Sequence, residues 1–232
     1  MRILFICSFL CISTLSLSAQ VSIGFKGGVN LAKWTNIDNY VDVYNDILVD
    51  EFLVGVNVGI VTEVNLYQEL YVQAEVNFTH KGHHPKQLVG THIYNTYAHF
   101  DLYVLELAFL PKYKYSWDSF GVFAFAGPSV GYYINCTKTK FSSRNGEVNE
   151  TGRNYLALDT DLFNRWEFSL YLGGGIFIPI KDSMEVFFDA RYLVGLTDVN
   201  NEAILQAFHL RGEELAHRNR GIGLTLGALF DL

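Results

Sequence analysis

The sequence predicts an all-β protein, an eight-stranded antiparallel up-and-down transmembrane β-barrel of the outer-membrane type. Three observations predict it. Several segments alternate apolar and polar residues with a period of two, as strands with one apolar and one polar face do. The connections between these segments are alternately long and short. The chain is half apolar and only 18% charged, below the roughly 25% typical of soluble domains, with abundant Tyr (14), Phe (18) and Gly (20).

The first 19 residues have the features of a signal peptide, and residues 20–232 are expected to form one outer-membrane β-barrel domain. Arg2 supplies a positive charge, an apolar stretch follows over residues 3–17, and the small residue Ala19 precedes the expected cleavage point. Loss of Arg2 reduces the 17 Lys and Arg residues to 16 against 24 acids, a net charge of −8. Because there is no basic surplus, nucleic acid is not an expected partner.

Eight segments are predicted as strands. The last is the clearest, because every second residue from Ile222 to Phe230 is apolar. The first is rich in glycine, and the fifth is apolar on both faces, so the alternation does not assign its inward face. The predicted strands are 20–33, 52–64, 70–80, 99–114, 119–134, 165–179, 183–196 and 219–231.

The predicted connections sort by length. Consecutive antiparallel strands place odd and even connections at opposite ends, so all long loops fall at one end and all tight turns at the other. This is typical of outer-membrane barrels, and a β-sandwich has no reason for it. The connections are 34–51, 65–69, 81–98, 115–118, 135–164, 180–182 and 197–218. Aromatic residues near the strand ends match interfacial girdles: Trp34, Tyr67, Tyr71, Tyr113, Tyr115, Trp117, Tyr132, Tyr133 and Trp166.

Two other folds are weighed against the barrel. Residues 119–137 are uncharged and long enough for a membrane helix, but they contain Pro128 and several glycines, and their neighbours are predicted strands. A soluble lipocalin-like barrel has the same strand count, but it would place the apolar residues inside and the polar residues outside.

The interior of an eight-stranded barrel is just wide enough for side chains to fill, so an open pore is not expected. The polar faces of the predicted strands carry both acids and bases, and buried charges need partners. The sequence therefore predicts a luminal network of ion pairs with a structural role, with a proton or ion path as the alternative. Its members are Glu63, Glu75, Glu106, Lys112, Arg165, Glu167, Asp189 and Arg191.

The connection 81–98 and its edges are rich in histidine. His80, His83 and His84 are weak candidates for a transition-metal site, because neutral imidazoles bind such metals. Their spacing fits no standard zinc motif, so no metal is predicted and a solvated polar loop is the expectation. Lys81 and Lys86 are considered as contacts for lipid phosphates at the outer surface.

Two of the long loops are expected to contain short amphipathic helices. In 34–51, the acids Asp38, Asp42, Asp46 and Asp50 recur every four residues and would form a solvated acidic stripe, with a bound calcium ion as the alternative. In 197–218, the helix would run from Glu202 to Leu210.

No set of nucleophile, base and acid stands in register, so no catalytic residue is predicted. His80 or His99 is the available base, with the hydroxyl of Thr79, Thr91 or Thr96 nearby, but no G-x-S-x-G motif, phosphate loop or dinucleotide fingerprint occurs. No cofactor is expected. After loss of the signal, Cys136 is the single cysteine, so the exported chain has no internal disulfide and this thiol is expected to be inert.

The chain resembles the PorT-like outer-membrane β-barrel family of Bacteroidetes-type Gram-negative bacteria. The matching pieces are residues 20–30 (QVSIGFKGGVN), 105–113 (LELAFLPKY), 126–132 (AGPSVGY), 188–197 (FDARYLVGLT) and 219–220 (NR). They lie in family order across nearly all of the chain after the signal. The resemblance implies a small barrel in the outer membrane. Founding members are linked to protein secretion and gliding, a role that does not carry over by itself. The ending also departs from the usual aromatic terminus, since Asp231 and Leu232 follow Phe230.

The sequence thus favours a structural or interaction protein that presents long extracellular loops, because recognition usually resides in loops held by a rigid scaffold. Expected partners are outer-membrane lipid and other envelope proteins, and a monomer is expected. A role in secretion or in surface recognition is consistent with this prediction. The alternatives are a surface barrel that binds a small ligand or metal and, third, a lipid-modifying enzyme.

Overall fold

The computed structural model describes residues 20–35, 47–88, 94–144, 147–156, 164–181, 183–199 and 217–232. The signal segment 1–19, the acids Asp38, Asp42 and Asp46, and the helix expected over 202–210 lie outside the described residues. The secondary structure of the described chain consists of strands and turns. Among these residues there is no helix of the length and apolarity required to cross a membrane.

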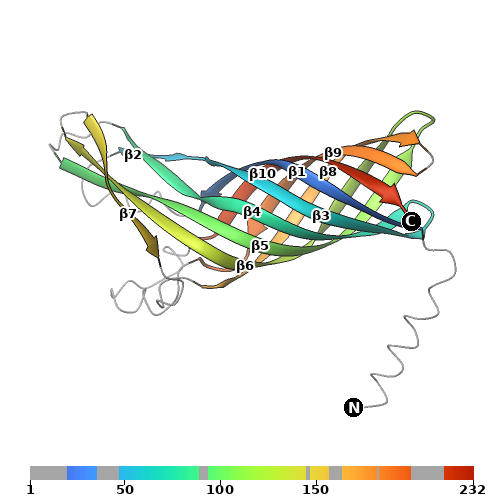
Figure 1. Ribbon diagram of the computed structural model, residues 1–232, viewed down its shortest axis with the longest axis horizontal. Helices are drawn as coiled ribbons and strands as arrows, with labels where there is room; N and C mark the ends of the chain where they lie inside the picture. Colours follow the sequence, from blue (N-terminus) through green and yellow to red (C-terminus); the bar gives the residue numbers. More distant parts are fainter. Residues whose placement is uncertain are drawn as a thin grey trace, which may run out of the picture.

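The described residues form ten antiparallel strands (Figure 1). Eight of them close into a barrel: β1 (Val21–Trp34), β3 (Leu53–Tyr67), β4 (Leu70–Leu88), β5 (Tyr94–Ser116), β6 (Gly121–Arg144), β8 (Trp166–Lys181), β9 (Met184–Gly195) and β10 (Asn219–Asp231). The two others, β2 (Ile47–Glu51) and β7 (Glu147–Leu156), pair only with β4 and β6, respectively, in the described chain.

The barrel closes because its first and last strands pair. Residues Ser22 to Trp34 of β1 pair with residues Asp231 to Asn219 of β10. Each of the other barrel strands pairs with the barrel strands that precede and follow it in the chain. Tight turns at 68–69 and 117–120, and the short connection between β8 and β9, gather at the end where the C-terminus lies (Figure 1), here called the turn end. The predicted eight-stranded up-and-down barrel is confirmed.

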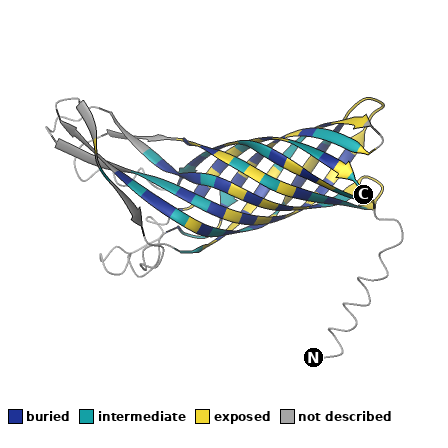
Figure 2. Ribbon diagram, viewed as in Figure 1, coloured by how far each residue is buried: buried dark blue, intermediate teal, exposed yellow. Residues whose placement is uncertain are grey.

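Burial alternates along the barrel strands, as the period of two requires (Figure 2). In β3, for example, Val54, Val56 and Val58 point outward and are 68%, 55% and 52% exposed, whereas Val61 and Glu63 point inward and are buried. Apolar residues therefore cover the outside of the barrel and form an apolar belt. This arrangement is suited to lipid, and it is the reverse of a soluble lipocalin-like barrel.

The sequence underestimated the length of several strands. β4 continues to Leu88, β5 begins at Tyr94, and β6 runs to Arg144 before β7 turns back along it, so most of the predicted loops 81–98 and 135–164 is strand. In these added segments polar residues occur on both faces of the strands, so the apolar alternation that marks a strand is absent. We call β2, β7 and residues 82–88, 94–101 and 135–144 the outer extension; it projects from the end opposite the turn end (Figure 1).

The helix predicted over 34–51 is wrong where the chain is described. Residues 47–51 form β2, which pairs with residues 84–88 of β4. Ile47 and Val49 are β-branched and favour a strand once an edge is available, and the extended edge of β4 supplies one. Asp50 therefore lies in a strand rather than on a helical acidic stripe.

The fifth predicted strand and part of the aromatic girdle also need correction. Residues 119–137 belong largely to β6, so the helix alternative is wrong, and the inward face carries Phe123, Phe125 and Ser129. Trp34 and Tyr133, which were assigned to the girdle, are 5% and 1% exposed and point into the barrel. Other girdle residues do face outward: Tyr67, Tyr113, Tyr115, Trp117 and Trp166.

Glycines make room for large rings in the lumen. A Cβ on Gly173 would lie 2.5 Å from the Phe125 ring, and one on Gly227 would lie 2.4 Å from the Phe187 ring. Both distances are far below normal carbon contacts, so the absence of a side chain at these positions lets the phenylalanines fold across the interior. The inward core is thus partly aromatic as well as charged.

Candidate functional site

Charged side chains inside the barrel gather in three clusters between the turn end and the outer extension. The turn-end cluster contains Glu63, Lys112, Lys114 and Glu185. The middle cluster contains Lys26, Glu75, Asp189 and Arg191. The outer cluster contains Lys81, Glu106 and Glu167.

In the turn-end cluster, two lysines on β5 share one carboxylate on β3. Lys112 Nζ lies 2.5 Å from Glu63 Oε2, and Lys114 Nζ lies 2.7 Å from Glu63 Oε1. Lys114 also donates to Glu185 on β9 at 2.8 Å. Gln73 accepts a hydrogen bond from Lys112 at 2.9 Å and leads to the next cluster. The cluster contains two acids and two bases and ties together strands on different sides of the barrel.

The middle cluster is centred on Glu75 of β4. Its carboxylate accepts hydrogen bonds from Lys26 Nζ at 2.5 Å and from Arg191 Nη1 at 2.8 Å. Arg191 forms a bidentate pair with Asp189, through Nε and Nη2, both at 2.8 Å. Gln73 donates to Glu75 at 2.5 Å and so joins the middle and turn-end clusters. Two acids again balance two bases.

The outer cluster has two carboxylates and one amine. Lys81 Nζ lies 3.0 Å from Glu106 Oε1 and 2.8 Å from Glu167 Oε2, and all three side chains are almost fully buried. Neutral groups donate to these two carboxylates: Thr79 and Tyr171 to Glu106, and Tyr133, Ser169 and Asn219 to Glu167. The hydrogen bonds from neutral donors disperse the charge of the extra carboxylate, as buried charges require.

Together these clusters brace and fill the lumen. Lys112, Lys81, Tyr133 and Phe187 are among the largest fully buried side chains in the described chain. Aromatic faces cover the cations, with Lys112 Nζ 4.0 Å from the centre of the Phe123 ring. An interior packed in this way is a core and leaves no room for a wide aqueous channel among the described side chains.

Seven of the eight charged residues expected in the lumen lie in these clusters, and Arg165 does not. Residue 165 precedes β8, so the strand alternation does not extend to it. Its side chain is half-buried and donates to the Tyr132 hydroxyl at 3.2 Å.

The sequence reasoning missed three luminal lysines. Lys26 follows the outward Phe25 in β1, and Lys114 lies two residues after Lys112, so the period of two could have identified both. Lys81 was considered for the outer surface because the strand was expected to end at residue 80. It is fully buried, because β4 continues and keeps odd positions inward.

The structure separates the three candidate metal ligands. His80 and His84 point outward and both bond to one oxygen of Asp101, at 3.0 and 3.1 Å, whereas His83 points inward and stacks on Trp34 with centroids 5.5 Å apart. Throughout the described chain, no group of three or more His, Cys, Asp and Glu side chains is arranged to hold a metal ion. The alternation along β4 explains why neighbouring histidines do not converge.

Asp101 and His83, which lie beyond the apolar belt, have pKa values below their usual range. Hydrogen bonds from His80 and then His84 hold the pKa of Asp101 well below its usual range. Burial, reinforced by nearby histidines and Lys33, lowers the pKa of His83 to about 4, so His83 is neutral in the folded protein at neutral pH.

Of the residues considered for catalysis, Thr79 and His80 do not form a pair, and Thr91 lies outside the described residues. Thr79 points into the lumen and donates to Glu106 at 2.8 Å, while His80 points outward, so the hydroxyl and the imidazole lie on opposite faces of β4. Cys136 lies in the outer extension, and burial raises the pKa of its thiol to about 12.

A closed barrel with an apolar exterior and an ion-paired interior is the architecture of an outer-membrane β-barrel protein. The sequence model of the outer membrane protein beta-barrel domain family matches residues 16–201, and the chain belongs to that family. An outer-membrane location follows from this membership.

Solved structures with related architecture have low sequence identity to this chain. Neisserial surface protein A (NspA) is 11% identical with a TM-score of 0.48, covering 92% of this chain and 99% of its own. Ail, the attachment invasion locus protein of Yersinia pestis, is 11% identical with a TM-score of 0.41, covering 93% and 100%. The outer membrane protease OmpT from Escherichia coli is 10% identical with a TM-score of 0.43, covering 94% and 99%. No curated protein matches the chain.

Proposed function

We propose that this protein is a monomeric, non-enzymatic outer-membrane barrel whose outer extension recognises partners at the cell surface. Residues 1–19 act as its export signal, and it works without a cofactor. Its partners are outer-membrane lipid around the belt and other envelope or external molecules at the extension; nucleic acid is not among them. The observation that carries the proposal is the contrast between a filled lumen and strands that continue past the apolar belt.

The filled lumen favours recognition over transport. Ionic clusters occupy the interior from Glu185 near the turn end to Glu167 near the outer end, and each cation is held by at least one carboxylate. A solute passing through would have to break buried pairs, which costs several kcal/mol for each broken pair. Recognition on strands that extend from a rigid barrel has no such barrier.

We also propose that, within its family, this protein is a PorT-like member. A contribution to secretion would then act through contact with other envelope proteins rather than through passage of cargo along the barrel axis.

A short-extension variant tests the proposal. Residues 84–99 and 137–163 are each replaced by a tight turn, which removes most of the outer extension and leaves the parts of the barrel strands within the apolar belt intact. Wild type and variant are refolded in the same detergent, and their folding is compared by the change in gel mobility on boiling. Both are then applied to immobilised matrix proteins, glycans and lipopolysaccharide.

We expect wild type to bind at least one of these surfaces and the variant to lose that binding while it remains folded. We also expect no steady conductance from wild type in planar bilayers. Equal binding by the two folded proteins, or stable channel currents from wild type, would contradict the proposal.

A further inference from the structure

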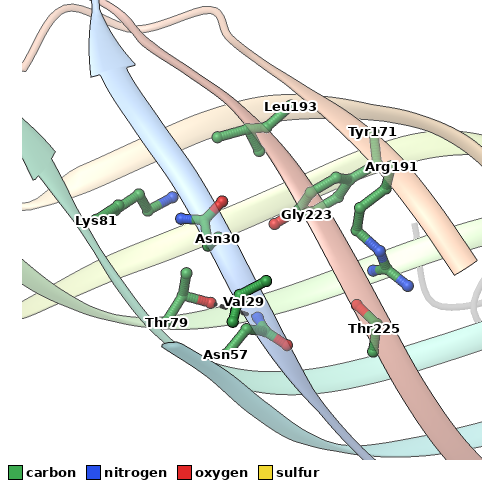
Figure 3. A pocket seen from close by; sticks show the side chains of 10 residues that line it. All are labelled: Val29, Asn30, Asn57, Thr79, Lys81, Tyr171, Arg191, Leu193, Gly223 and Thr225. Atoms are coloured by element: carbon green, nitrogen blue, oxygen red, sulfur yellow. Dashed lines mark hydrogen bonds between the residues drawn. The ribbon is translucent and has the colours of Figure 1, made fainter. Parts of the chain in front are cut away.

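A small cavity lies between the middle and outer clusters (Figure 3). Its volume is about 20 Å³, and its polar lining comes from six strands: Asn30, Asn57, Thr79, Lys81, Tyr171, Arg191 and Thr225. A cavity needs roughly 10–15 Å³ to hold a water molecule, and it holds one only if polar partners are present. Size and lining both meet this requirement.

The lining contains an unused acceptor. Asn57 Nδ2 donates to Thr79 Oγ1 at 2.8 Å, the contact drawn in Figure 3, but Asn57 Oδ1 is buried and has no hydrogen-bond partner among the described residues. A buried amide oxygen without a partner costs roughly 1–3 kcal/mol, so a donor in this cavity is strongly favoured.

The lining also contains unused donors. Arg191 makes four hydrogen bonds, two to Glu75 and two to Asp189, out of the five that a guanidinium offers. Lys81 pairs with Glu106 and Glu167, which uses two of its three N–H groups. One N–H of each cation is therefore available to a further acceptor.

We propose that this cavity binds one water molecule, which donates to Asn57 Oδ1 and accepts from Lys81 or Arg191. Water fits better than an ion. A cation would be repelled by both Lys81 and Arg191, and an anion would face the Asn57 carbonyl oxygen and the nearby carboxylates. A neutral molecule that both donates and accepts satisfies the acceptor and the donors together.

A water molecule that accepts from Arg191 and donates to Asn57 joins the middle and outer clusters. Gln73 already links the turn-end and middle clusters. With the water in place, hydrogen bonds run from Glu185 at the turn end through Arg191, the water, Asn57 and Thr79 to Glu106. The lumen then contains a single connected polar network rather than two separate ones.

A crystal structure of the refolded full-length barrel, at a resolution that shows ordered waters, tests this directly. We expect one water peak within hydrogen-bond distance of Asn57 Oδ1. A dry cavity, or density that refines as a heavier ion such as chloride, would overturn the proposal.

Solution NMR supplies a second test that does not depend on crystals. The side-chain amide of Asn57 should show a direct cross-peak with slowly exchanging water, and Asn57→Leu, which removes the acceptor, should abolish water contacts at Thr79. If that variant does not fold, Gly223→Ala replaces it, since its methyl would lie 3.0 Å from Arg191 at the cavity wall. Gly27→Ala is the matched control, because its methyl meets only ordinary contacts at 3.8 Å or more. Unchanged water contacts in the cavity variants would count against the site.

Discussion

Glu75 is the residue on which the middle cluster depends, and Glu75→Gln is the substitution that tests the ionic packing of the lumen. The change keeps the shape of the side chain but removes its negative charge. Lys26 then loses its carboxylate partner at 2.5 Å, while Arg191 keeps Asp189 at 2.8 Å. In the variant, one buried cation therefore has no counter-charge.

The expected loss follows from the burial of both groups. The side chains of Lys26 and Glu75 are 0% exposed, so solvent cannot replace the missing charge. Removing one member of a fully buried pair typically costs about 3–5 kcal/mol. Because each 1.4 kcal/mol is tenfold in an equilibrium constant, the ratio of unfolded to folded barrel should rise at least a hundredfold.

Urea unfolding in lipid vesicles, followed by the change in gel mobility on boiling, measures this loss. Glu69→Gln at an exposed turn is the control and should remain within about 0.5 kcal/mol of wild type. The double variant Lys26→Met, Glu75→Gln removes both charges and should be more stable than Glu75→Gln alone. A Glu75→Gln barrel within 1 kcal/mol of wild type, or a double variant less stable than the single one, would refute the reasoning.

Three further predictions concern the outer half of the molecule. The imidazole of His83 should titrate near pH 4 when its chemical shifts are followed by NMR. Because the same imidazole in the unfolded chain binds a proton near pH 6.5, the free energy of unfolding should fall as the pH drops from 6.5 to 4. A titration midpoint near 6.5 in the folded protein would be inconsistent with the burial of His83. Gly82 has φ 151°, and a Cβ added there would lie 2.0 Å from the Phe100 carbonyl oxygen. Gly82→Ala should therefore destabilise the outer extension by about 1–3 kcal/mol, measured as faster backbone hydrogen exchange in the extension while the barrel stays folded. Unchanged hydrogen exchange would show that the substitution causes no strain. Tyr133→Phe removes the hydroxyl between Glu167 and Asn219 and should cost about 1–3 kcal/mol in urea unfolding; a neutral effect would show that the hydroxyl does not support the outer cluster.

The barrel was predictable from the sequence because lipid and lumen impose opposite demands on alternate residues. In β10 every second side chain from Ile222 to Phe230 must be apolar toward lipid, and this leaves a readable pattern. The outer extension lacks that constraint. Residues 82–88 and 135–144 carry polar residues on both faces, so no apolar period marks them as strands and the sequence predicts loops there.

The charged residues of the lumen were predictable where the alternation was clear, and the pairing between them was not. Glu75 could be assigned inward from β4 alone, but its contacts with Lys26 and Arg191 depend on barrel closure, which brings β1, β4 and β9 around one space. Trp34 and Tyr133 were misassigned for a related reason. A position near a strand end suggests an interfacial girdle. Whether the side chain faces lipid or the lumen depends on which of the two alternating faces of the strand the residue occupies.

Labelling of single cysteines on intact cells tests most directly that the outer extension faces outward from a membrane-spanning barrel. Cys136 is first replaced by Ser, and either Gly152→Cys in β7 or Glu69→Cys at the turn end is introduced. A Cβ at Gly152 has nothing described within 4 Å, and Glu69 is exposed, so both thiols should be accessible from their own side of the membrane.

The reagent is a maleimide that does not cross membranes. We expect Gly152→Cys to react on intact cells and Glu69→Cys to react only after the outer membrane is permeabilised. Reaction of Glu69→Cys but not Gly152→Cys on intact cells, or equal reaction of both before permeabilisation, would contradict the account.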